Sequence, residues 1–370
     1  DFEYGIKFAT QTRQRLIGPP GTGKTHTLIE WVKEELAAGI DSRQIAFVAF
    51  TRVAAHTAAD RINNDGEASS ENGFPNFSTI HSLATRMGGS LGLHLVTEEH
   101  LREFDPRVYV EKEWTIPGDA NSIVERHKHP VLQAYSLQLA TGSSELTFND
   151  DDIDDAIDAL NSFYVNRVNH SNFLQYAEAS IKAYENFKRT KCLADFNDVL
   201  LNVTSPSFNP EKIPCFEVLF VDEAQDLSKL QWRFIELLAK RARRTIVSGD
   251  DDQAIMAGFG ASPESFINFT VTENDWPLPV SNRIPPSLKL WLDKTIIPLI
   301  ESNPDRIKKT WEGNPQKTHE GRISDHKLVD GTDDNGKAIK TPRLININDL
   351  VYAVAERQDE EWLIMAPTRA

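Results

Sequence analysis

The strongest signal in the sequence is Gly18-Pro19-Pro20-Gly21-Thr22-Gly23-Lys24-Thr25. Its spacing, a glycine followed after four residues by Gly-Lys-Thr, is that of a phosphate-binding P-loop. Glycines in such a loop let successive backbone N–H groups approach phosphate oxygens. Residues 14–17 can form a strand before the loop, and residues 25–38 have the apolar periodicity of a helix whose amino end would face the phosphates. A chance match in a Gly/Pro-rich loop is the alternative, but this strand–loop–helix context favours a phosphate site.

Composition describes an ordinary soluble globular chain. The 370 residues allow two or three domains, and 40% are hydrophobic and 26% charged. Apolar runs are too short to cross a bilayer, and residue 1 begins no signal-peptide pattern. Two cysteines, Cys192 and Cys215, lack metal-ligand spacing, and we expect buried, reduced thiols.

The net charge of −15 argues against a surface that is basic throughout. Nucleic acid needs only a local basic track, and three short segments are candidates. They are residues 188–191, 240–244 and 306–309. Each is also compatible with an ordinary solvated surface, which is the more common role of such a run.

Continuous apolar runs at residues 45–50, 217–221 and 245–248 are typical of strands buried on both faces of a parallel sheet. Helical patterns follow the first two. Together with the P-loop, they predict an α/β fold, a doubly wound P-loop NTPase domain. Residues 96–192 show helical periodicity instead and predict an inserted helical subdomain. The acidic run at residues 150–155 fits a capped helix start better than a divalent-metal site.

Two adjacent carboxylates, Asp222 and Glu223, follow the apolar run at 217–221. A P-loop enzyme needs acidic groups at the end of a neighbouring strand, one serving Mg²⁺ and one orienting the attacking water. An isolated acid pair would carry no information. After a buried strand, in a chain with a P-loop, this pair predicts a nucleotide-hydrolysing site.

The chain resembles superfamily 1 DNA helicases of the UvrD/Rep/PcrA type, whose motifs occur here in family order. They are the P-loop (motif I), Phe50-Thr51-Arg52-Val53-Ala54-Ala55 (Ia), Thr79-Ile80-His81-Ser82 (Ib), the segment containing Asp195, Phe196, Asp198 and Leu200, Asp222-Glu223-Ala224-Gln225-Asp226 (II), Gly249-Asp250-Asp251-Asp252-Gln253-Ala254-Ile255 (III) and Ser281-Asn282-Arg283 (IV). Motifs II and III together are specific for this subgroup.

The resemblance implies a motor of two RecA-like domains with ATP and Mg²⁺ between them. Residues 1–95 and 193–275 would form domain 1A, residues 96–192 the helical insert 1B, and residues 276–370 the beginning of domain 2A. Nucleotide contacts would come from Gly18, Pro19, Pro20, Gly21, Thr22, Gly23, Lys24, Thr25, His26, Gln11 and Gln14. Thr25 and Asp222 would serve Mg²⁺, while Glu223, Lys24, Gln253 and Arg283 would be catalytic. Single-stranded DNA would contact Phe50, Thr51, Arg52, Thr79, His81 and Phe259, although His81 could also be an ordinary buried histidine.

The expected activity is ATP-dependent 3′→5′ translocation on single-stranded DNA with unwinding at single-strand/duplex junctions, in a cytoplasmic protein of prokaryotic or phage origin. The alternative is an ATP- and DNA-binding module that acts through partners without productive unwinding. Family motifs V and VI would follow Ala370, so we expect a fragment with weak turnover. Asn282 replaces the family's stacking tyrosine, and Met256 and Gly258 replace aromatic residues after motif III, leaving Phe259 as the substitute.

Overall fold

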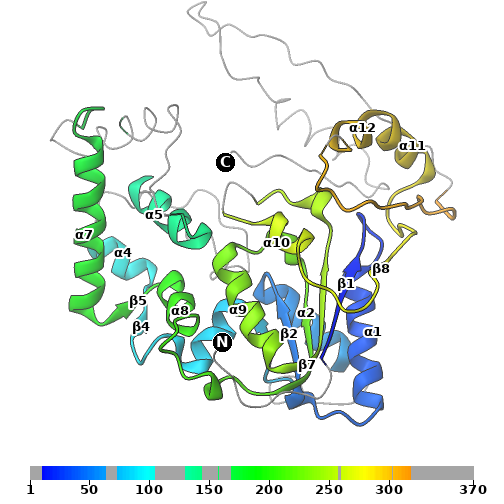
Figure 1. The fold of residues 1–370 in the computed structure, drawn as a ribbon, viewed down its shortest axis with the longest axis horizontal. Coiled ribbons are helices and arrows are strands. Elements are labelled where there is room, and N and C mark those ends of the chain that lie inside the picture. The colour runs from blue at the N-terminus through cyan, green and yellow to red at the C-terminus, as the bar shows by residue number, and fades with distance from the viewer. Residues whose placement is uncertain are drawn as a thin grey trace, which may run out of the picture. The chain divides into compact units, whose positions relative to one another are not determined.

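The computed structural model describes residues 11–63, 73–104, 130–143, 157, 168–256, 260–301 and 303–317. Its framework is a parallel sheet of six strands in the order β3-β2-β6-β7-β1-β8 (Figure 1). The strands are β1 (Thr12–Ile17), β2 (Ile45–Ala49), β3 (Phe77–Thr79), β6 (Phe216–Val221), β7 (Ala242–Gly249) and β8 (Trp276–Pro277). The predicted α/β class is confirmed, and the three apolar runs are β2, β6 and the centre of β7.

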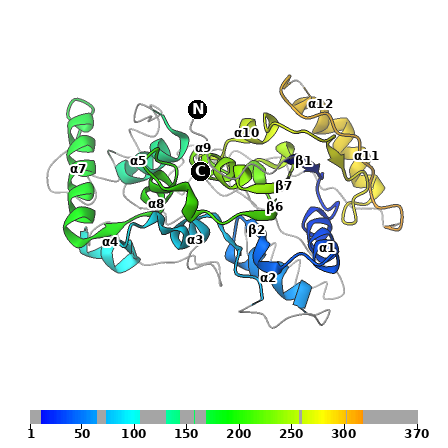
Figure 2. The ribbon, with the colours of Figure 1, turned by 60° about the horizontal axis from the view of Figure 1, so that its bottom comes forward.

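Helices cover both faces of this sheet because alternate strand residues point to opposite sides. In β6, Val218 and Phe220 pack with helices α1 (Lys24–Ala37) and α2 (Arg52–Asn63). Leu219 and Val221 pack on the other face, which is covered by α3 (Ile80–Ala84), α8 (Phe196–Val203) and α9 (Lys229–Lys240). Figure 2 shows α2 and α9 on opposite sides of the central strands. Burial on both faces explains why these strands read as unbroken apolar runs.

The functional consequence of the parallel sheet is that the carboxyl ends of its strands share one edge. The P-loop follows β1, Thr51 follows β2, and the segment with His81 follows β3. Asp222 follows β6, and Asp250 follows β7. In an open α/β sheet, ligands bind at this edge.

The helical part between the two α/β segments begins and ends side by side. Strands β4 (His94–Leu95) and β5 (Leu193–Ala194) pair in parallel at its two ends. Between them lie α4 (Glu98–Phe104), α5 (Pro130–Thr141) and α7 (Phe173–Lys191), with a small core of their own that includes Val131, Phe173 and Ala177. The acidic run at 150–155 lies outside the described residues.

The chain after motif III returns to the first sheet. Helix α10 (Pro263–Ile267) is followed by β8, which pairs with Leu16 and Ile17 of β1. Trp276 and Pro277 are thus part of the same sheet as the P-loop strand. Helices α11 (Pro286–Thr295) and α12 (Ile297–Ile300) come next, and residues 1–318 form one compact unit.

Two expectations about individual side chains are corrected. Cys192 is exposed, not buried, and it is the C-cap residue of α7 with φ of 55°. Cys215 is half-buried. In the part of the chain that the structure describes, no helix combines the length and apolar character needed to cross a membrane.

Candidate nucleotide site

The P-loop joins β1 to α1 with a backbone that requires glycine at two positions. Gly21 has φ of 73° and Gly23, which caps α1, has φ of 93°. These left-handed values are strained for residues with a Cβ. At Gly18 the constraint is space, because a Cβ there would lie 2.3 Å from Lys24 Cγ. The buried Lys24 ammonium donates to the Gly18 carbonyl at 3.0 Å. The lysine is thus folded back along its own loop.

Thr25 and Asp222 meet directly, although 197 positions separate them in the chain. The Thr25 hydroxyl donates to Asp222 Oδ2 at 2.6 Å, and Asp222 is 2% exposed. Burial raises the pKa of Asp222 to about 6, and the neighbouring charge of Glu223 adds to this, while the Thr25 hydrogen bond opposes it. The carboxyl therefore titrates near neutral pH rather than far below it.

Glu223 has an unusual backbone that turns its side chain back toward the P-loop. Its φ of 49° is one of the few positive values among the described non-glycine residues. Such strain concentrates at functional sites. Its carboxylate lies 3.9 Å from Lys24 Nζ and is 41% exposed. Lys24, Thr25, Asp222 and Glu223 thus form one cluster at the carboxyl edge of the sheet.

A hydrogen-bonded network extends from this cluster to the end of β7. Gln225 Nε2 donates to Glu223 Oε2 at 2.9 Å, and the Asp250 backbone N–H donates to Gln225 Oε1 at 3.1 Å. Gln253 Nε2 donates to Asp250 Oδ2 at 2.6 Å. A Cβ at Gly249 would stand 2.6 Å from Gln225 Oε1, so this approach requires glycine. Gln225 thus connects Glu223 with Asp250, and the sequence alone predicted no role for it.

The segment Ser281–Arg283 lies on the P-loop. The Asn282 N–H donates to the Gly21 carbonyl at 2.8 Å, and the Ser281 hydroxyl donates to the Pro20 carbonyl at 2.8 Å. A Cβ at Gly21 would come within 2.4 Å of Arg283 Cβ. Arg283 is exposed beside the loop, as its expected place near the phosphates requires. Its guanidinium contact with a nucleotide stays a prediction.

Other expected nucleotide contacts are less well placed. Gln11 donates to the carbonyls of Lys240 and Ala242, both at 3.0 Å. These groups lie at the amino end of the strands, opposite the P-loop, so this position does not support a role for Gln11 in binding adenine. Gln14, within β1, donates to the Asn274 carbonyl at 3.2 Å. His26 is exposed on α1, two residues after Lys24.

The expected DNA contacts lie at the ends of β2 and β3. Phe50 and Thr51 are half-buried after β2, and Thr51 Oγ1 accepts the Ala54 N–H at 3.1 Å, which caps α2. The side chain of Arg52 and the whole of Phe259 lie outside the described residues. Only part of the expected DNA path can therefore be traced.

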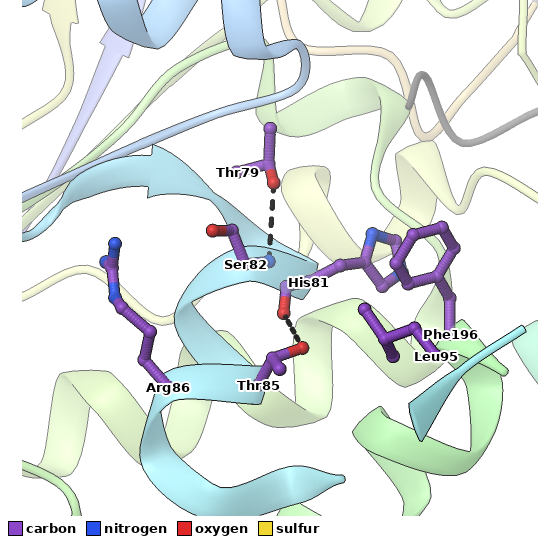
Figure 3. A pocket seen from close by; sticks show the side chains of 7 residues that line it. All are labelled: Thr79, His81, Ser82, Thr85, Arg86, Leu95 and Phe196. Carbon is purple, nitrogen blue, oxygen red and sulfur yellow. Dashed lines mark hydrogen bonds between the residues drawn. The ribbon is translucent and has the colours of Figure 1, made fainter. Parts of the chain in front are cut away.

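Thr79 and His81 line a cavity of about 130 Å³ together with Ser82, Thr85, Arg86, Leu95 and Phe196. Figure 3 shows the His81 ring beside Phe196, with a centroid distance of 4.7 Å, while Arg86 extends away on the other side. His81 is 5% exposed, and its Nδ1 has no hydrogen-bond partner among the described residues. Burial lowers the pKa of His81 to about 4, and Asp195 opposes this shift. The imidazole is neutral near pH 7.

In each of the three basic segments, at least one cation is paired with carboxylates of this chain. Lys188 is 3% exposed and contacts Asp195 and Asp198 at 2.8 and 2.7 Å. In the segment 306–309, Lys309 is buried against the aspartates of motif III, and Arg306 pairs with Asp252. In the segment 240–244, Arg243 and Arg244 pair with Glu217 and Glu35. Residue type alone could not reveal these partners, which are distant in sequence.

Comparison with known proteins gives a consistent family. Residues 6–273 match the UvrD/REP helicase N-terminal domain. A probable DNA helicase of Mycoplasma pneumoniae is 27% identical over 256 residues, which cover 66% of this chain and 45% of that protein. The ATP-dependent DNA helicase PcrA of Staphylococcus epidermidis is 25% identical over 280 residues, covering 71% of this chain and 34% of PcrA. DNA helicase II of Salmonella typhimurium is 24% identical over 323 residues, which cover 82% of this chain and 40% of that protein. The aligned part is less than half of each relative, but the family match takes in most of this chain, which therefore belongs to the UvrD/REP helicase family.

Proposed function

We propose that this chain is the ATP-binding part of a DNA helicase that moves 3′→5′ along single-stranded DNA and unwinds it at duplex junctions. Family membership and the names of its relatives support the reaction class. The proposed polarity is the one that the resemblance of motifs II and III to this subgroup implies. In this proposal residues 1–95 and 193–275 are domain 1A, residues 96–192 are insert 1B, and residues 276–370 begin domain 2A.

The observation that carries the proposal is the 2.6 Å contact between Thr25 and Asp222, with Lys24 and Glu223 beside it. A P-loop hydroxyl against a buried carboxylate at the end of β6 provides oxygen ligands of the kind Mg²⁺ prefers. The raised pKa of Asp222 fits this role, because a buried carboxylate without a cation is poorly solvated. We assign Thr25 and Asp222 as the Mg²⁺ residues; bound Mg²⁺ would neutralise phosphate charge.

The remaining roles follow from position and chemistry. Lys24 is near enough to exchange its Gly18 carbonyl for a phosphate oxygen, and backbone N–H groups of the loop would bind the other oxygens. Glu223 is the partly exposed carboxylate of the cluster, so it can accept a proton from a water while Asp222 stays buried. Gln253 and Arg283 would contact the terminal phosphate, and Thr51 and Thr79 would lie on the DNA path.

The test is steady-state ATP hydrolysis with and without single-stranded DNA. Glu223→Gln should retain ADP binding but lower kcat by about 10²–10⁴-fold, the usual contribution of a general base. Lys24→Ala should weaken nucleotide binding itself. Glu217→Gln is the matched control, since Glu217 lies in the same strand β6 and pairs with Arg243 on the surface. Unchanged hydrolysis in Glu223→Gln would refute the assignment.

The same assay separates the alternative function. Hydrolysis stimulated by DNA supports a motor, and displacement of a strand from a duplex with a 3′ tail but not a 5′ tail supports the polarity. Binding of ATP and DNA without hydrolysis would instead favour a binding module that works through partners. The substitutions Asn282 and Met256 motivate that alternative, because a stacked base at an aromatic residue is worth about 1–3 kcal/mol.

A further inference from the structure

The aspartates of motif III are neutralised from a distant part of the chain. Lys309 Nζ lies 2.5 Å from Asp250 Oδ1, 2.5 Å from Asp251 Oδ1 and 2.9 Å from Asp252 Oδ2. The Lys309 side chain is 2% exposed and that of Asp250 is fully buried. Burial alone would lower the pKa of Lys309, but the carboxylates outweigh it and raise that pKa above its ordinary value. The ammonium is therefore charged at the end of β7.

Residues around Lys309 fix it in this place. Arg306 donates to both oxygens of Asp252, at 2.7 and 2.8 Å, and the Ile307 N–H donates to Asp251 Oδ2 at 3.0 Å. The three aspartates offer oxygens within 4.8 Å of one another, a spacing that a metal could use. Lys309 already occupies the position between them. This cluster is thus an internal ion pair rather than a second metal site.

Asp250 connects Lys309 to the proposed hydrolytic residues. One of its carboxylate oxygens binds Lys309, and the other accepts from Gln253 at 2.6 Å. Its backbone N–H donates to Gln225, whose amide donates to Glu223. Without Lys309, the Asp250 carboxylate would be buried with no counter-charge, which is strongly unfavourable. It would draw other hydrogen-bond donors toward itself, and Gln253 already donates to it at 2.6 Å.

We propose that Lys309 is a positioning residue for nucleotide hydrolysis: by pairing with Asp250 it holds Gln253 and, through Gln225, Glu223 in their working orientations. The inference rests on the proposed ATPase function. The same pair couples residues 303–317 to the nucleotide site. A movement of that segment must either move Asp250 together with Lys309 or break the Lys309–Asp250 pair. A purely structural ion pair is the competing explanation.

The experiment compares Lys309→Met with Lys308→Met, its exposed neighbour in the same segment. Lys309→Met should lower kcat about 10- to 100-fold, as misplacement of a catalytic group does, while the Kd for ADP changes less than about threefold. Lys308→Met should leave both unchanged. Lys309→Arg keeps the charge and should recover part of kcat. A folded Lys309→Met variant with normal kcat would overturn the proposal.

A second variant distinguishes loss of catalysis from loss of folding in Lys309→Met. Lys309→Met combined with Asp250→Asn removes the charge of the fully buried Asp250 and leaves Asp251 as the carboxylate that has lost its lysine. The double variant should therefore be more stable than Lys309→Met alone and should hydrolyse ATP faster. If the double variant regains stability in urea but not kcat, and Lys309→Arg also fails to recover kcat, Lys309 is structural only and the proposal is wrong.

A readout independent of hydrolysis separates this inference from the proposed function. In a chain labelled with ¹⁵N-glutamine, Lys309→Met should shift the side-chain amide signals of Gln225 and Gln253, identified by their Asn variants, and Lys308→Met should not. If wild-type chain shows no hydrolysis yet these signals shift, the ATPase proposal fails and the positioning network stands. Unshifted signals would overturn the network even in an active enzyme.

Discussion

The buried His81 makes a quantitative prediction about stability and pH. Its pKa falls from 6.5 to about 4 in the folded chain, chiefly because burial disfavours the imidazolium. Between these values the unfolded state binds a proton that the folded state excludes. The stabilising contribution of neutral His81 is therefore complete above pH 6.5 and is lost as pH falls toward 4, at about 1.4 kcal/mol per pH unit. From about pH 7.5 to about pH 5, the loss should be about 2 kcal/mol.

Other groups titrate in the same range with the opposite sign. Burial and the charge of Glu223 raise the pKa of both Asp222 and Asp226 to about 6, so the folded state gains protons there as pH falls and is stabilised. The wild-type curve is thus a sum of opposing effects. The difference between wild type and a His81 variant isolates the histidine.

The assay is urea unfolding of wild type, His81→Gln and His94→Gln at about pH 7.5 and about pH 5. Because the contact with Phe196 is lost, His81→Gln should be less stable than wild type at both pH values. Its free energy of unfolding should, however, fall by about 2 kcal/mol less than that of wild type between about pH 7.5 and about pH 5. His94 is exposed, so His94→Gln should follow wild type. Equal pH dependence in wild type and His81→Gln would refute the reasoning, because the imidazole would then be accessible to protons.

Two further substitutions test the P-loop and the anchoring of α7. Gly21→Ala should weaken ADP binding by about tenfold or more, because left-handed strain of about 1–2 kcal/mol is joined by a clash with Arg283. Gly39 also has a positive φ, but a Cβ added there would meet no heavy atom of the other described residues within 4 Å. Gly39→Ala should therefore leave the ADP affinity unchanged. Lys188→Met should cost about 1–3 kcal/mol in urea unfolding, since it leaves the partly buried Asp195 and Asp198 carboxylates without their cation, whereas Lys182→Met, with its exposed side chain, should cost little.

The fold could be predicted from the sequence because its strongest features are local. Strands buried on both faces give continuous apolar runs, and the P-loop combines a fixed spacing with a strand and a helix. Parallel pairing then brings the carboxyl ends of β1, β6 and β7 to one edge without further information. The meeting of Thr25 with Asp222 follows from these rules, although its 2.6 Å distance does not.

What could not be predicted is which charged groups would find one another. The basic residues at 306–309 resemble a nucleic-acid track in sequence, yet the Lys309 side chain is buried and Arg306 is paired, because residues 54 to 59 positions apart meet at motif III.

These internal pairs bear on how an acidic chain would hold DNA. Among the described side chains, Lys188 and Lys309 are committed to aspartates, His81 is neutral, and Arg86 near the end of β3 donates to Ser78. Neutral groups also lie on the edge formed by the ends of β2 and β3: the hydroxyls of Thr51 and Thr79, which cap helices, and the backbone N–H groups of the same turns. Neutral donors position a phosphate by geometry and release few counterions. The affinity for a DNA strand would then depend on the conformation of these turns. A nucleotide-driven motor must be able to change that affinity.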